Sequence, residues 1–171
     1  MARYADPGAL EWVESGGGPL IAVPETVLPF WAGADSEDLA TDYDRACEVD
    51  GPVGLLPVGD SAALVFGDEP DSTSFLPEHA TFVRWSAAYS EAELLAGVPA
   101  ALDAAVWGSE VRWRVPGPVL LFDAARPGRA AGRTEHLRVP LEAGTYAVRA
   151  AYAQPGPETW LGLVRLSRIS A

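Results

Sequence analysis

The stretch WVESGGGPLIAVPE, residues 12–25, sets the pattern that the rest of the chain repeats. Two short apolar runs flank three consecutive glycines, which reach the positive φ angles of tight turns at little steric cost. Pro24 ends the second run because proline cannot donate a hydrogen bond to a β-ladder. The stretch therefore predicts a β-hairpin that turns at residues 16–18.

A similar pattern, WRVPGPVLLF at residues 113–122, predicts a second hairpin from strands at 111–115 and 118–123. Further hairpins are expected where apolar runs flank turn residues. They pair 53–57 with 62–67 and 136–141 with 144–152. Residues 81–86 and 159–167 are also predicted strands, whereas 68–79 has the composition of a loop.

The clearest helix signal is the capping box Ser-Glu-Ala-Glu that starts at Ser90. In this motif the serine oxygen accepts from the Glu93 N–H, and the Glu93 carboxylate accepts from the Ser90 N–H. The pattern predicts the main helix over residues 90–106, kinked or split by Gly97 and Pro99. A shorter helix is expected within the acidic segment 35–50, capped by Ser36, with Leu39, Tyr43 and Ala46 on its buried side.

These elements predict an α+β fold: one β-rich domain over residues 1–171, with antiparallel strands and hairpins joined by the helix near 90–106. Residues 10–86 and 111–168 have similar sequence patterns, which suggests an internal repeat. The repeat would align Pro19 with Pro118, Pro57 with Pro140, and Arg84 with Arg165. Duplication and chance similarity both remain open as explanations. Trp12, Trp85, Trp113 and Trp160 lie in strand segments and are expected in the core.

Charge is distributed unevenly between the two halves of the chain. The net charge is −12, and residues 1–80 contain 16 acidic residues against two arginines. A nucleic-acid partner is disfavoured, because phosphate contacts need a basic face. The acidic half would suit a basic protein partner, although a charge that serves solubility alone is the alternative.

Targeting and redox signals point to the cytoplasm. The chain opens without a charged and apolar signal sequence, and no apolar run reaches the ~18–20 residues of a membrane span. The single Cys47 excludes an internal disulfide and is expected to be a small buried residue.

Several stretches resemble the immunity protein 21 family of bacterial polymorphic toxin systems. They are WVESGGGPLIAVP at 12–24, Trp31, DYDRACEV at 42–49, LVFGDEP at 64–70, FVRW at 82–85 and the helix start SEAELL. The resemblance implies a cytoplasmic protein that binds and neutralises a toxin domain made by the same or a sister cell. It implies neither which toxin activity is inhibited nor which face binds.

Chemical motifs for catalysis are sparse. His79 and His136 are the only histidines, and no G-x-S-x-G nucleophile motif is present. The carboxylates of 42–50 lack the spacing of a calcium loop, so neither a metal nor a cofactor is expected. We therefore expect a non-enzyme, with a small-molecule hydrolase that uses a carboxylate-lined pocket as the alternative.

Toxin binding is expected to involve the acidic segments and the aromatic residues within them. Tight inhibition generally needs an interface of about 1,600 Å² with a few desolvated anchors. The segments 31–50 and 68–79 are both acidic and lie between regular elements. The predicted toxin-binding residues are Trp31, Asp42, Tyr43, Asp44, Glu48, Asp50, Asp68, Glu69 and Asp71.

Overall fold

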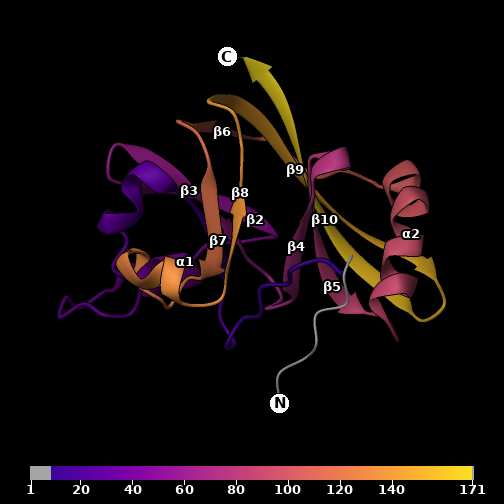
Figure 1. Cartoon of the computed structure of the whole chain (residues 1–171), viewed down its shortest axis with the longest axis horizontal. Coiled ribbons are helices and arrows are strands. Elements are labelled where there is room, and N and C mark those ends of the chain that lie inside the picture. The colour runs from indigo at the N-terminus through magenta and orange to yellow at the C-terminus, as the bar shows by residue number, and fades with distance from the viewer. Residues whose placement is uncertain (1–8, 171) are drawn as a thin grey trace.

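The structure is a computed structural model that describes residues 9–170. Two antiparallel five-stranded sheets face each other, and helices cover their outer faces (Figure 1). The β-rich α+β class predicted from the sequence is confirmed.

The first sheet has the strand order β2-β3-β1-β7-β8. Its strands are β2 (Val53–Val58), β3 (Ser61–Phe66), β1 (Leu20–Pro24), β7 (Val119–Asp123) and β8 (His136–Val139). The second sheet has the order β4-β5-β10-β9-β6. Its strands are β4 (Ser72–Leu76), β5 (Thr81–Ala87), β10 (Thr159–Ser170), β9 (Gly144–Gly156) and β6 (Val111–Val115).

The main core lies between the two sheets. Leu20 and Ala22 of β1 point into it, whereas Ile21 and Val23 face the opposite side of the same sheet. That outer side is covered by the 3-10 helices η1 (Glu25–Phe30) and η3 (Gly128–Arg133) and by α1 (Asp42–Cys47). β1 is therefore buried on both faces, which explains its unbroken apolar sequence.

The outer face of the second sheet is covered by the long helix α2 (Glu91–Ala104), at the right of Figure 1. Leu94 and Val98 of α2 pack on Leu161 and Leu163 of β10. Gly97 permits the close approach of α2 to β9, because a Cβ there would lie 2.6 Å from Pro155 Cγ. α2 continues through Pro99 as one helix, so the predicted split is wrong.

The predicted capping box of α2 forms only in part. Ser90 Oγ accepts from the Glu93 N–H at 3.1 Å, as expected. The Glu93 carboxylate instead accepts from the Tyr89 N–H at 3.3 Å and from Thr159 Oγ1 at 3.0 Å. Glu93 thus joins the start of the helix to β10 rather than closing the box.

Residues 12–25 do not form the predicted hairpin. Val13 bridges to Thr73 of β4 in the second sheet, whereas β1 belongs to the first sheet. The glycines therefore carry the chain from one sheet to the other. The predicted hairpins at 111–123 and 136–152 are wrong for the same reason, since β6–β7 and β8–β9 also change sheets. The β2–β3 hairpin is confirmed.

Three other local expectations are corrected. Residues 68–79 contain β4 and a short 3-10 turn, η2 (Pro77–His79), as well as a loop. α1 begins after Thr41 rather than Ser36, and Leu39 is fully exposed. Among the tryptophans, Trp113 is buried, but Trp160, the second residue of β10, is 49% exposed and does not belong to the core.

Strand order is similar in the two halves of the chain. β1 pairs with β7 at the centre of one sheet, and β5 pairs with β10 at the centre of the other. η1 follows β1 as η3 follows β7. Pro19 and Pro118 directly precede the paired strands β1 and β7. This arrangement is compatible with a repeat, which stays a prediction.

Of the other two predicted alignments, one stays a prediction and one is wrong. Pro57 lies in β2 and Pro140 directly follows β8, and these strands form the two opposite edges of the same sheet, so their alignment stays a prediction. Arg84 points between the sheets with Phe82, whereas Arg165 lies on the outer face, 4.1 Å from the Trp107 ring centroid. A register change of one residue moves every side chain to the opposite face, so these two arginines are not equivalent.

Arg84 is the largest charged side chain in the core and is 1% exposed. Its guanidinium donates to the backbone oxygens of Gly67 at 3.1 Å and Glu69 at 2.6 Å, and its Nε donates to Thr73 Oγ1 at 3.2 Å. Burial lowers the pKa of Arg84, and the nearby Asp71 carboxylate opposes this shift. Arg84 therefore attaches the loop between β3 and β4 to the core.

Replacing Arg84 by methionine should destabilise the fold by about 3 kcal/mol, because buried carbonyl oxygens lose their donors. Arg165→Met is the matched control and should cost about 1 kcal/mol, since it removes one half-buried cation–π contact with Trp107. Denaturant unfolding of both variants checks this. Equal losses in the two variants would contradict the role given to Arg84.

Replacing Ser90 by alanine should lower the free energy of unfolding by about 1 kcal/mol, because the Glu93 N–H loses its acceptor. Ser36→Ala is the control, since Ser36 bonds only within an exposed loop, to Asp38. It should change stability by less than roughly 0.5 kcal/mol. A thermal melt in which Ser36→Ala is less stable than Ser90→Ala would refute the capping role of Ser90.

Candidate functional site

The two acidic segments predicted from the sequence meet at one end of the β2–β3 hairpin. The Gly67 N–H donates to Pro52 O at 3.0 Å, which joins the end of β3 to the segment before β2. A Cβ on Gly67 would lie 2.3 Å from Gly51 O, so only glycine permits this approach. The backbone of residues 49–52, which includes Asp50 and follows Glu48, thereby lies beside the start of the loop that holds Asp68 and Glu69.

The loop that holds Asp68 and Glu69 is fixed through its backbone. Arg84 binds the carbonyl oxygens of Gly67 and Glu69, and Asp68 adopts a left-handed conformation with φ of 60°. Both side chains are exposed to solvent. Asp71 is half-buried and accepts from Ser86 Oγ at 2.7 Å. The loop is thus held rigidly while its first two carboxylates remain free to bind.

Two predicted carboxylates on α1 have structural partners. Asp42 accepts from the Ala32 N–H at 2.8 Å and forms an ion pair with Arg45. Asp44 accepts from the Thr41 N–H at 2.9 Å, and this hydrogen bond holds the pKa of Asp44 below its usual value. These two carboxylates fix α1 and the segment before it.

Tyr43 and Cys47 line a small pocket of about 220 Å³ between α1, the glycine turn and the loop of Asp68. Tyr43 packs over Gly18, where a Cβ would lie 2.1 Å from the phenol oxygen. A hydrogen bond with Cys47, together with partial burial, raises the pKa of Tyr43 above its usual value. Cys47 is exposed, so the expectation that it is buried is wrong.

Trp31 is 2% exposed and donates from its indole nitrogen to Ala124 O at 3.0 Å. It packs with Val27 and Ala46 under the first sheet. A partner cannot reach it without opening this core, so Trp31 is removed from the candidate surface. We define the acidic surface as Glu48, Asp50, Asp68 and Glu69, with Tyr43 beside it.

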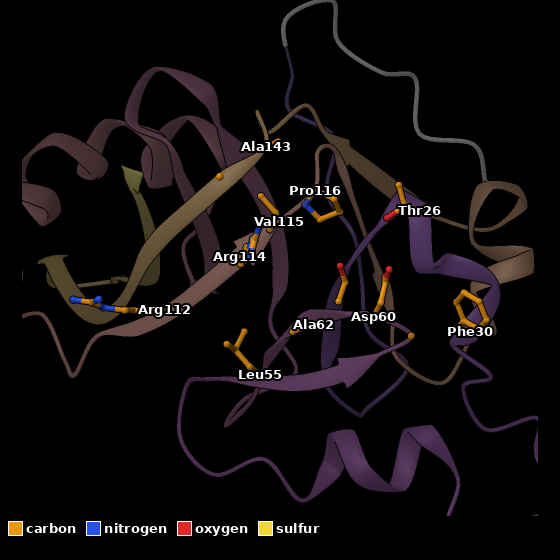
Figure 2. A pocket seen from close by; sticks show the side chains of 13 residues that line it. Thr26, Phe30, Leu55, Asp60, Ala62, Arg112, Arg114, Val115, Pro116 and Ala143 are labelled. Atoms are coloured by element: carbon orange, nitrogen blue, oxygen red, sulfur yellow. The ribbon is translucent and has the colours of Figure 1, made fainter. Parts of the chain in front are cut away.

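A larger hollow lies at the other end of the β2–β3 hairpin (Figure 2). It measures about 1160 Å³ and opens to solvent between β6, the tip of the hairpin and η1. Phe30, which is 65% exposed, lies on one side and Arg114 on the other. The sequence patterns did not reveal this hollow, because its walls come from four separate segments and carry no common motif.

Groups suited to catalysis are not brought together in the part of the chain that the structure describes. His79 is exposed after β4, and His136 lies in β8, where its ring nitrogen contacts Thr134 O at 2.8 Å. Between residues 9 and 170, no three histidine, cysteine, aspartate or glutamate side chains are grouped as metal ligands. No helix in the same range has the length and apolar character required to span a membrane.

The sequence pattern of the family described as immunity protein 21 matches residues 11–159. No curated protein and no solved structure matches the chain. The matched residues include β1, the Arg84 strand, α2 and both segments of the acidic surface. Because the match extends over most of the 171 residues, the chain belongs to the immunity protein 21 family.

Proposed function

We propose that this immunity protein neutralises a toxin domain in the cytoplasm by binding it stoichiometrically through the acidic surface. The observation that carries the proposal is the convergence of two acidic segments, distant in sequence, on one rigid site. Glu48 and Asp50 follow α1, whereas Asp68 and Glu69 lie on the loop attached to Arg84.

The negative charge of the acidic surface supports a basic toxin partner. Residues 1–80 hold 16 of the 24 acidic residues, and the four carboxylates of the acidic surface have no ion pair within residues 9–170. Toxins that act on nucleic acid have basic clefts, to which such a surface is attracted over long range. A preformed site also loses little conformational entropy on binding.

Titration of the cognate toxin domain with this protein distinguishes inhibition by binding from enzymatic inactivation. Toxin activity should fall linearly with added protein and end at one molecule per toxin, independent of incubation time. The measurement is residual toxin activity against molar ratio. Complete inactivation at a small fraction of the toxin concentration, progressing with time, would instead favour the hydrolase alternative.

The charge of the acidic surface can be removed without changing its size. Glu48→Gln, Asp50→Asn, Asp68→Asn and Glu69→Gln together keep the fold, because asparagine also tolerates the left-handed conformation at position 68. Association with the toxin should slow about tenfold at low salt and lose most of its salt dependence. Asp42 and Asp44 are left unchanged because their carboxylates hold α1.

The matched control neutralises four exposed carboxylates elsewhere: Glu11, Glu78, Asp103 and Glu158. This variant has the same net charge as the first and should associate faster than it, at a rate nearer that of the unaltered protein. Association rates at low and high salt, with a thermal melt for each variant, provide the comparison. Equal rates in the two variants would show that net charge alone, not the acidic surface, attracts the partner.

A further inference from the structure

β6 is an open edge of the second sheet. It pairs with β9 on one side, and no strand among residues 9–170 pairs with its other side. The opposite edge, β4, is instead bridged by Val13, with N–H to carbonyl distances of 2.9 and 3.0 Å in both directions. An unpaired edge offers backbone donors and acceptors that an added strand can satisfy.

The hollow in Figure 2 lies directly beside this edge. Trp113 donates from its indole nitrogen to Ala62 O at 2.8 Å and so holds β6 against β3. Leu55, Ala62 and the exposed Phe30 give the hollow apolar walls. Side chains that point inward from an added strand would therefore meet apolar groups.

The solvent side of the same edge is basic. Arg112 and Arg114 alternate with the buried residues of β6, so both point away from the core, at the solvent-facing rim of the hollow. Arg149 on β9 lies directly opposite Arg165 on β10, an unfavourable cross-strand pairing of like charges. Glu110 pairs with Arg112 at 3.1 Å and with Arg149 at 3.5 Å, whereas Arg114 has no ion pair within the described residues. Glu110 therefore neutralises only part of the positive charge of Arg112, Arg114 and Arg149.

We propose that an extended segment of the toxin partner adds to β6 as a further strand. Its outward side chains are acidic and pair with Arg112 and Arg114, and its inward side chains are apolar and enter the hollow. The inference rests on the proposed function and names a second contact in the same complex. It identifies the segment by its chemistry: alternating acidic and apolar residues without proline.

The acidic surface and the hollow can contact one partner together. They lie at opposite ends of β2, whose six residues span roughly 20 Å. β2 is itself an edge strand, but Pro57 lacks a donor and makes it less suited to strand addition. A toxin that lies along β2 would therefore contact the acidic surface through side chains at one end of β2 and would pair with β6 near the other end.

Amide hydrogen exchange of the unaltered protein, free and bound to the cognate toxin domain, tests the strand pairing. Amides of β6 that exchange in the free protein should become protected in the complex. The same experiment on the toxin should show protection of a segment with alternating acidic and apolar residues.

A charge-reversal variant tests the side-chain contacts. Arg112→Glu with Arg114→Glu should raise the dissociation rate of the complex about tenfold or more, because like charges then face each other across the added strand. Arg129→Glu with Arg133→Glu on η3 is the control with the same charge change. Its dissociation rate should stay within about twofold of the unaltered protein, and thermal melts confirm folding.

The outcomes separate this inference from the proposed function. A complex that forms with β6 amides unprotected, or with protection of a neutral or basic toxin segment, overturns the strand addition and leaves inhibition by binding intact. An unchanged dissociation rate in the folded Arg112 and Arg114 variant also overturns it. Absence of any binding by the unaltered protein would instead refute the proposed function.

Discussion

The hydrogen bonds of Arg84 connect the core of this protein to its candidate binding surface. A guanidinium that is 1% exposed has to be paired, because a buried charge without partners is strongly unfavourable. Its partners are the carbonyl oxygens of Gly67 and Glu69 and the hydroxyl of Thr73. These bonds fix the loop between β3 and β4 through its backbone and leave the carboxylates of Asp68 and Glu69 in solvent. The same arginine belongs to the FVRW stretch of the family resemblance, which gives that stretch a physical role.

The two sheets also determine which surfaces remain open. α2 covers one part of the second sheet, and η1, η3 and α1 cover the first, so most apolar side chains are enclosed. What stays accessible is an acidic surface at one end of β2 and an open strand edge with outward arginines near the other. The opposite charges at the two ends create an electric field around the molecule, and this field can orient an approaching partner before contact. An immunity function that depends on fast and tight association is well served by such an arrangement.

Local patterns in the sequence were enough to predict most strands and the start of α2, because alternation, turn residues and caps are short-range signals. Pairing was harder to predict. The glycines after Val13 connect strands of different sheets, yet the same residues would also suit a hairpin, since a turn pattern does not specify the sheet of the following strand. The face of Arg84 depends on register, which composition does not reveal. For the site, the sequence placed acidic residues in two segments, but only the fold shows that Asp42 and Asp44 stabilise α1 and that Trp31 is buried. The hollow beside β6 combines residues from four segments and had no sequence signal.

A structure of the protein bound to its toxin domain would show whether the acidic surface is the binding site. Asp68 and Glu69 should lie within 4 Å of lysine or arginine side chains of the toxin, the distance that defines an ion pair. Arg84 should keep its bonds to Gly67 and Glu69, because the loop is already formed in the free protein. A toxin seated on α2, with the loop from Gly67 to Asp71 left in solvent, would contradict the account.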